Sequence, residues 1–566
     1  MAIKKSCRQC NSEFTIEDAD LEFYKKISPT FAGKTFEIPP PTLCPECRSQ
    51  RRMVWRNEKK LYKRKSDLSQ KEIISTLSPD KPYKVYDQDE WWSDKWDAME
   101  YGLDYNSNKS FFEQYHDLYE KVPKINLINV NHENSDFLSF ARGNKNSYLL
   151  FSAIDNEDCF YSTNIDNCKS CVDCLLLVQC TSCYEAIESQ DCFNCQHIQE
   201  CRECSDCSNL YDCKECDHCL FCSGLRRKSY HAFNKPIEKE EYTKLLEKIH
   251  APENLARFKI IMGNTPRRCA KILKSEDVTG DNISNCKNCR NIFDTYGCED
   301  CAYLIRSVKC NSTLDCNYTM ANYCLEGLDI DENGNRNLYA LSCWSSNDIL
   351  YSTNCHASNN LFGCAGLRHK QYCILNKQYS KDEYEKITAN IIEKMQKDGE
   401  WGEYFPVSLA PFGYNETVAN EYFPLDKEGA SKLEAKWQDN DFSPKYEGPY
   451  IEPKNIDEYI KSAEEAEKLL SGVIKCEVSG KPFKLMPQEF KFYIENKIPI
   501  PTKHYDVRHA ERFNKRNPLK LYKRECMCEE SGHSHEGRCK NEFETTYAPD
   551  RKERVYCESC YQKTVI

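Results

Sequence analysis

The hydrophobic and polar positions in the middle of the chain repeat every three residues. Every cysteine between Cys159 and Cys222 lies at a multiple of three, and Leu, Ile and Ala fill other positions of this column. The residue before each column position is mostly Asp, Asn, Glu or Ser, as at Asp158 and Asn167. Neither an α-helix, with about 3.6 residues per turn, nor a flat strand, with about two, has this period. The pattern predicts a solenoid of short strands with frequent corners, in which each coil buries its column against the next.

A shift of 142 residues lays a second copy of this pattern on the first. The shift places Cys159 on Cys301, and both copies end with the tripeptide Gly-Leu-Arg. Each copy then runs into Asn-Lys and a helical tail. We therefore predict two cysteine-rich solenoid copies, each with a closing helix, at 139–250 and 281–392.

Two interpretations of the central cysteines compete: ligands of a metal or an iron–sulfur cluster, or small apolar side chains of a core. The Cys-x2-Cys-x2-Cys run at 168–174 has a cluster-like spacing. The duplication tests this, because the shift places Cys171 on Thr313 and Cys183 on Leu325. A ligand cannot become Leu without losing a metal bond, whereas a core position tolerates the change. We predict packing, with a redox or iron–sulfur protein as the alternative.

Metal chemistry is expected at the ends of the chain. Cys7-x2-Cys10 and Cys44-x2-Cys47 form two tandem knuckles that supply four thiolates. Four soft protein ligands at tetrahedral geometry close a structural zinc site and leave no open position for a substrate. We expect this zinc ion to fold the module rather than to catalyse a reaction.

The residues around these cysteines carry a family resemblance. Phe14 follows the first knuckle, Phe23-Tyr24 lies in the spacer, and Pro41 precedes the Cys-Pro-x-Cys-Arg48 run. This arrangement resembles a zinc-ribbon family of bacterial proteins. The whole layout is similar to multi-zinc-ribbon, cysteine-rich repeat proteins of small-genome bacteria. The ribbon motif covers about a tenth of the chain, and the resemblance implies bound zinc and no activity.

A second copy of this module lies near the C-terminus and has lost half of its ligands. Its four ligand positions read Cys476, Ser479, His504 and Val507. Two of these four residues are not zinc ligands, so we expect packing rather than metal to hold this copy together.

A last ribbon is predicted at the C-terminus, with a Cys-x2-Cys knuckle near its end. The predicted ligands of its zinc ion are Cys528, Cys539, Cys557 and Cys560. Cys526 and His535 are the alternatives to Cys528, which we favour as the fourth ligand. With one ion for each four-ligand site, the two ribbons predict about two zinc ions per chain.

These elements define the predicted fold class: α+β, mostly β, with a duplicated cysteine-rich β-solenoid-like repeat flanked by small zinc ribbons and short helices. The predicted segments are a zinc ribbon with a basic helix (1–66), an aromatic-rich helical segment (67–138), the first solenoid copy (139–250), a linker (251–280), the second copy (281–392), an aromatic-rich connection and helix (393–470), the degenerate ribbon (471–525) and the C-terminal ribbon (526–566).

Length and composition bear on the number of domains, on the cellular compartment and on whether the protein has a membrane partner. The chain has 566 residues, which predicts several domains, and 37 cysteines. It has no apolar run like that of a signal peptide, and none near the roughly 20 residues that cross a bilayer. We therefore expect free and metal-bound thiols in the cytoplasm, and no membrane partner.

Opposite charges are segregated along the chain, whose net charge is −11. Residues 155–217 hold 14 acidic and three basic side chains, whereas 48–65 hold nine basic and one acidic. A helix running on from Cys47 would place most of these basic residues on one face. Such a stripe favours contact with a nucleic-acid backbone, and the alternative is that it docks on the protein's own acidic middle. The predicted nucleic-acid-binding residues are Arg48, Arg51, Arg52, Arg56, Lys59, Lys60 and Lys63.

The motifs typical of common enzyme classes are missing from the sequence. It contains no P-loop, no GxGxxG after a strand, no GxSxG and no HExxH, and we nominate no catalytic residue. We predict a non-enzymatic zinc-binding scaffold that contacts nucleic acid or a ribonucleoprotein through its basic terminal modules. The alternatives are a protein–protein interaction scaffold without nucleic acid, and a redox or iron–sulfur protein that uses the central cysteines.

Overall fold

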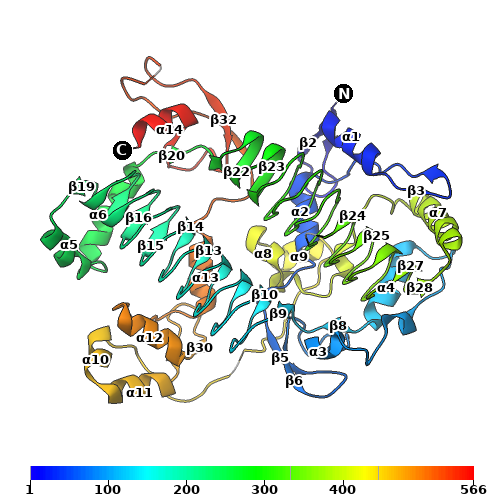
Figure 1. Ribbon diagram of the computed structural model, residues 1–566, viewed down its shortest axis with the longest axis horizontal. Coiled ribbons are helices and arrows are strands. Elements are labelled where there is room, and N and C mark those ends of the chain that lie inside the picture. The colour runs from blue at the N-terminus through cyan, green and yellow to red at the C-terminus, as the bar shows by residue number, and fades with distance from the viewer. Residues whose placement is uncertain (1, 332, 444, 534, 566) are drawn as a thin grey trace.

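Two stacks of short parallel strands form the middle of the protein, and small modules from both ends of the chain pack against them (Figure 1). The computed structural model describes residues 2–331, 333–443, 445–533 and 535–565. The fold is α+β and mostly β, with a duplicated solenoid and cysteine-rich terminal modules, as predicted. Within the described ranges, no helix is both long and apolar enough to cross a membrane.

The first stack, residues 129–236, is a parallel β-solenoid with coils of twelve residues. Neighbouring strands pair at this spacing, as in Ser139↔Phe151. The residue before each inward position has a positive φ, 54° at both Asp155 and Asp158. Asp and Asn adopt this left-handed conformation more readily than most residues, so the polar column of the sequence marks the corners. The strands are β9 Asn129–Val130, β10 Ser139–Arg142, β11 Phe151–Ile154, β12 Thr163–Asp166, β13 Leu175–Val178, β14 Ile187–Gln190, β15 Gln196–Gln199, β16 Ser208–Tyr211, β17 Asp217–Ser223, β18 Ser229–Ala232 and β19 Lys235–Pro236.

The second stack, residues 272–378, follows the same plan with two irregularities. Its first coil has eleven residues, since Ile272 pairs with Ile283, and the register shifts between Val278 and Gly280. The second irregularity lies farther along. Glu299 pairs with Asn311 twelve residues later, but Asn311 pairs with Asn322 after eleven residues and Asn322 with Asn335 after thirteen. The short and the long coil cancel, so the 142-residue offset holds on both sides of them. The strands are β21 Ile272–Leu273, β22 Glu276–Ser284, β23 Lys287–Tyr296, β24 Asn335–Leu338, β25 Asn347–Leu350, β26 Asn359–Phe362, β27 Gln371–Ile374 and β28 Lys377–Gln378.

The irregular coils correct one comparison made from the sequence. Between the short coil and the long coil, corresponding residues of the two stacks are 141 positions apart. Cys183 therefore corresponds to Cys324 and not to Leu325. Both of these cysteines are fully buried. Cys171 still corresponds to Thr313, which is also fully buried. Of the two cysteines compared, only Cys171 is therefore replaced by another small residue in the second stack.

The central thiols are core side chains that also donate hydrogen bonds to the backbone. The Sγ of Cys171 lies 3.4 Å from the carbonyl oxygen of Lys169 and 3.5 Å from that of Cys180 in the next coil. Ser189 fills an equivalent inward position, and its hydroxyl donates to the carbonyl two residues earlier at 3.0 Å. Burial raises the pKa of Cys222 to about 12. In the part of the chain that the structure describes, the groups whose ligand atoms all lie within 4.8 Å of one another include no sulfur of either stack. This geometry supports packing over ligation.

Four small modules come from the ends of the chain, two from each end. We define module 1 as residues 3–53, module 2 as 62–91, module 3 as 474–513 and module 4 as 522–564. The elements of modules 1 and 2 are β1 Ile3–Ser6, β2 Glu13–Ile16, α1 Asp18–Ile27, β3 Thr30–Phe31, β4 Lys34–Thr35, α2 Pro45–Met53, β5 Tyr62–Lys65, β6 Glu72–Ser75, β7 Val85–Tyr86 and α3 Gln88–Trp91. Those of modules 3 and 4 are β29 Ile474–Lys475, β30 Pro482–Phe483, α12 Pro487–Glu495, α13 Tyr505–Phe513, β31 Tyr522–Glu525, β32 Glu542–Thr545, β33 Val555–Tyr556 and α14 Glu558–Thr564.

The segments between the modules and the stacks differ from the sequence prediction. The helix expected to continue from Cys47 past residue 65 ends at Met53, and β5 follows it. The segment predicted as helical, 67–138, contains strands as well, and the predicted linker, 251–280, holds a helix and three strands. The remaining elements are η1 Ala98–Tyr101, α4 Phe111–Lys121, β8 Lys124–Ile125, α5 Lys239–Leu246, α6 Pro252–Asn264, β20 Arg267–Arg268, α7 Lys381–Asp398, η2 Val407–Leu409, η3 Tyr414–Glu416, α8 Val418–Tyr422, α9 Lys427–Lys432, α10 Ile456–Lys461 and α11 Ala463–Ser471.

Module 1 docks on the second stack through buried ion pairs. Arg48 Nε donates to Asp315 Oδ1 at 2.8 Å, and Arg52 Nη1 donates to Glu326 Oε2 at 2.5 Å. The Arg48 guanidinium also lies over the ring of Tyr303, 5.1 Å from its centroid. Burial alone would raise the pKa of Glu326, but the charges of Arg52 and its neighbouring arginines hold it below its usual value. The helix α2 is therefore fixed to the stack by charge pairing inside the protein.

Module 3 docks on the first stack with the same chemistry. Arg508 and Arg512 of α13 both pair with Asp173, and Arg512 Nη1 lies 2.9 Å from its Oδ1. The Arg508 guanidinium lies 4.8 Å from the ring centroid of Tyr161. Asp173 is the counterpart of Asp315 under the 142-residue shift. The contact between module and stack is thus duplicated. Module 1 docks on the second stack and module 3 on the first, in each case the stack that is farther away in the sequence (Figure 1).

We predict that Asp315→Asn weakens the docking of module 1. The substitution leaves two buried guanidinium groups with one carboxylate fewer, and breaking a buried pair in this way costs about 3–5 kcal/mol. The loss is measured as a lower denaturant midpoint for the unfolding transition that includes Trp55. Asp173→Asn should destabilise module 3 to a similar extent. Asp155→Asn, at an exposed corner of the first stack, is the matched control, and an equal loss from it would contradict the role given to Asp315.

A buried histidine gives a second prediction, on pH. His356 lies between Trp92 and Trp344, with ring centroids 4.7 and 4.6 Å away. Burial, with Arg368 nearby, lowers the pKa of His356 to about 3. In the unfolded chain its pKa is about 6.5, so between pH 6.5 and 3 the unfolded state binds more protons and the fold loses stability as the pH falls.

For this one group, the expected loss at pH 5 is about 2 kcal/mol relative to pH 8. His356→Phe should remove this part of the acid sensitivity, read as the change in denaturant midpoint between the two pH values. His369→Gln, at an exposed position, should leave the acid sensitivity as it is in the wild type. An unchanged difference between pH 8 and pH 5 in His356→Phe would refute the buried neutral histidine.

Candidate metal centres

Module 1 gathers its four cysteines at one point. Cys7 follows the first strand of the β1–β2 hairpin and Cys10 lies in its turn, while Cys44 caps the N-terminus of α2 and Cys47 lies in the first turn of that helix. The four sulfur atoms lie within 4.8 Å of one another. Three of the cysteines are buried and Cys10 is exposed. The predicted ligand set of module 1 is therefore brought together.

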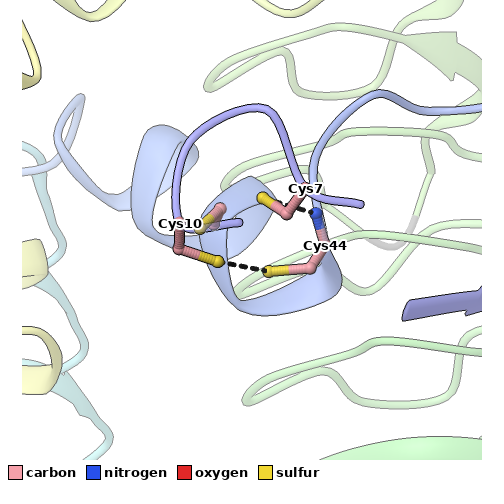
Figure 2. A group of neighbouring side chains, drawn as sticks. Cys7, Cys10 and Cys44 are labelled. Atoms are coloured by element: carbon pink, nitrogen blue, oxygen red, sulfur yellow. Dashed lines mark hydrogen bonds between the residues drawn. The ribbon is translucent and has the colours of Figure 1, made fainter. Parts of the chain in front are cut away.

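The surroundings of these sulfurs suit thiolates that bind a metal ion. The Cys44 N–H donates to Cys7 Sγ at 3.3 Å, and the Sγ atoms of Cys10 and Cys44 lie 3.7 Å apart; Figure 2 draws both contacts as dashed lines. A hydrogen bond from the Cys47 thiol lowers the pKa of Cys44 to about 7. A helix N-terminus adds further positive potential at Cys44. Four sulfurs with these supports fit a structural metal site with no vacant coordination position.

Module 4 builds an equivalent group and corrects one predicted ligand. Its four mutually close sulfurs are those of Cys526, Cys539, Cys557 and Cys560. The fourth member is thus Cys526 and not Cys528. The reason is backbone geometry: Cys526 Sγ accepts from the Cys557 N–H at 3.2 Å, as Cys7 Sγ does from Cys44. Although burial raises the pKa of Cys557, hydrogen bonds from the side chains of Ser559 and Asn541 lower it to about 6.

Module 3 keeps the backbone of module 1 without its four thiols. The Cys476 N–H donates to the Lys481 carbonyl at 2.9 Å, as the Cys7 N–H does to the Ser12 carbonyl at 2.9 Å. His504 takes the place of Cys44 as the helix cap, and its Nδ1 accepts from a backbone N–H of α13 at 3.2 Å. The buried arginines of α13 hold this module on the first stack.

Module 2 is a further copy of the ribbon that the sequence analysis missed. An offset of 470 residues places Val85-Tyr86-Asp87 on Val555-Tyr556-Cys557, and Glu90 on Cys560. Ser66 corresponds to Cys526: its Oγ donates to a carboxylate oxygen of Glu90 and accepts from the Asp87 N–H at 3.4 Å. A hydrogen-bonded serine and carboxylates thus occupy the place of the thiolates. The shared Pro-Asp turn before the Val-Tyr pair was the signal for this copy.

The predicted nucleic-acid stripe is largely internal, which is a correction. Arg48, Arg51, Arg52 and Arg56 are at most 8 % exposed and pair with carboxylates of this chain. Their partners in the second stack are Asp315, Glu326 and Asp329. These four arginines therefore offer nothing to a nucleic acid. The alternative considered from the sequence, docking on the protein's own acidic middle, was right in that the stripe faces carboxylates of this chain, but these belong to the second stack and not to the acidic segment 155–217.

The three lysines of the predicted stripe differ in burial and in ion pairing. Lys59 is mostly buried and pairs with Glu421, beside His509. Lys60 lies 3.5 Å from a carboxylate oxygen of Asp506, with 42 % of its side chain exposed. Lys63, on β5, is exposed. Two of the seven predicted residues thus remain on the surface.

Comparison of the sequence with models of known protein families finds no match, and a search of curated proteins finds none either. The resemblance to a zinc-ribbon family therefore stays a prediction. The close sulfur atoms of modules 1 and 4, and the backbone N–H groups that donate to them, support metal binding in both modules.

We predict that Cys44→Ser removes one metal ion from the protein and unfolds module 1. Loss of one of four ligands breaks a closed site whose metal binding supplies folding free energy. The metal content by elemental analysis and the protease sensitivity of the first 60 residues provide the measurement.

The matched controls for Cys44→Ser are Cys204→Ser and Cys476→Ser, which replace a stack thiol and the lone thiol of module 3. Both should keep the full metal content. Cys204→Ser should cost about 1 kcal/mol, since the hydroxyl can donate to the same carbonyls as the thiol. Metal loss in either control would contradict the division between terminal ligands and central core thiols.

Proposed function

We propose that this protein is a non-enzymatic scaffold in which structural zinc ions shape the terminal modules and the solenoid stacks present a surface to a protein partner. The zinc identity is supported by the all-sulfur ligand sets, since tetrahedral thiolate sites select zinc among the common divalent ions. Such a site has no open position for a substrate or an activated water. The metal therefore serves the fold.

The observation that carries the proposal is the internal use of the basic residues. An arginine stripe beside a zinc knuckle is typical of a phosphate contact, yet here the stripe is neutralised by Asp315, Glu326 and Asp329. Residues 155–217 of the first stack still hold 14 acidic and three basic side chains, although the exposed Glu203 and Glu215 pair with Arg202 and Arg227. An acidic face repels nucleic acid and favours a basic protein segment.

Contact with a nucleic acid or a ribonucleoprotein is the second candidate function. Fewer basic residues support it than the sequence analysis predicted. Its support is Lys63, which is exposed on β5, and the half-buried Lys60, which pairs with Asp506. A contact through so few cations would be weak and backbone-led, and would disappear as the salt concentration rises.

Fluorescence anisotropy separates the two candidates. A labelled single-stranded RNA and a labelled DNA duplex are titrated with the full-length protein at about 50 mM salt, where phosphate contacts are strongest. We expect no saturable binding. Binding that falls with added salt and is lost in Lys60→Glu/Lys63→Glu would instead establish the nucleic-acid contact, and the matched control for that pair is Lys427→Glu/Lys432→Glu on the exposed face of α9.

A further inference from the structure

Module 4 contains a second cluster of soft ligands beside its four-cysteine group. Cys528, His533 and His535 each place one ligand atom within 4.8 Å of the others and of the Cys560 sulfur. Cys560 therefore belongs to both groups. A pocket of about 320 Å³ lies at this point and is lined by His535, Cys539 and Cys560, among others.

The hydrogen bonds of the histidines prepare them for a metal ion. His535 Nδ1 lies 2.8 Å from the carbonyl oxygen of Gly537, so this nitrogen must carry the proton. The other ring nitrogen, Nε2, is buried and has no hydrogen-bond partner. A histidine held by a carbonyl at one nitrogen and free at the other is the usual arrangement of a metal ligand. His533 Nδ1 lies 3.1 Å from Cys528 Sγ, so these two candidate ligand atoms already face each other.

The loop that carries these residues is an insertion relative to module 2. In module 2 the Ser66 N–H bonds to the Lys71 carbonyl, five residues on, whereas in module 4 the Cys526 N–H bonds to the Asn541 carbonyl, fifteen residues on. The ten additional residues bring in both histidines. Residues 529–538 of this loop include no apolar side chain that could pack on the module, so this stretch needs another source of order.

We propose that module 4 binds two zinc ions that share the Cys560 thiolate. One ion takes Cys526, Cys539, Cys557 and Cys560, and the other takes Cys528, His533, His535 and Cys560. Seven residues then supply eight bonds, which gives each ion the four ligands of a structural zinc site. The second ion ties the inserted loop to α14.

This inference rests on the proposed function, in that module 4 must hold zinc at all. It also explains why the sequence offered Cys528, Cys526 and His535 as rivals for one position: the structure uses Cys526 in the first group and the other two in the second. The second site differs from the first in its two imidazole ligands, which are half-buried.

Native mass spectrometry of the full-length protein, purified with zinc as the added metal, counts the ions directly. We expect three per chain, one in module 1 and two in module 4. His535→Ala and Cys528→Ser should each reduce the count to two, and Cys560→Ser to one, because both ions of module 4 depend on it. His369→Ala is the matched control at an exposed position and should keep three. Circular dichroism checks that each variant retains the solenoid.

The outcomes separate this inference from the proposed function. A count of two in the wild type, unchanged in His535→Ala, would overturn the second ion and leave the structural zinc of both modules in place. A count of three that falls only to two in Cys560→Ser would overturn the shared thiolate. A count of zero or one in the wild type would overturn the proposed function as well.

Discussion

The organisation of the molecule depends on a pairing between buried guanidinium groups and carboxylates of the stacks. Asp315 and Asp173 lie at corresponding places in the two solenoids, and each receives two arginines from the helix of a terminal module. A charge removed from water is stable only next to its partner, so each docking position is specific. One apolar cluster then joins module 1 to the second stack, and another joins module 3 to the first.

The same small fold is closed by grouped thiols in some modules and by other contacts in the rest. Modules 1 and 4 hold four close sulfurs, whereas module 2 closes the same backbone with Ser66 and Glu90, and module 3 relies on its docking contacts. Each end of the chain thus keeps one thiolate module and one without a complete set. A ribbon too small to fold by its own core needs either a metal ion or a larger neighbour. The stacks supply that neighbour.

The candidate site was predictable where ligands are close in sequence. The Cys-x2-Cys spacing identified the four close sulfurs of module 1 and two of those in module 4, and Cys539 was also predicted. The choice between Cys526 and Cys528 was not predictable, because both precede a long loop and only the closed hairpin decides which sulfur meets the Cys557 N–H. The twelve-residue coil could have been found, since the cysteines at 159, 171, 183, 195, 207 and 219 already repeat at that spacing.

The sequence by itself determined the repeat, because a side chain that alternates between inside and corner must do so at a fixed period. It likewise determined the metal-type knuckles, whose ligands are neighbours along the chain. Only the tertiary structure decided the role of Arg48, Arg51, Arg52 and Arg56. Apart from Glu58, which pairs with Arg56, their carboxylate partners lie more than 260 residues away. A positive stripe has the same pattern whether it faces phosphate or the protein's own acids. Charge pairing over such separations depends on how the chain is folded back, which no local pattern records.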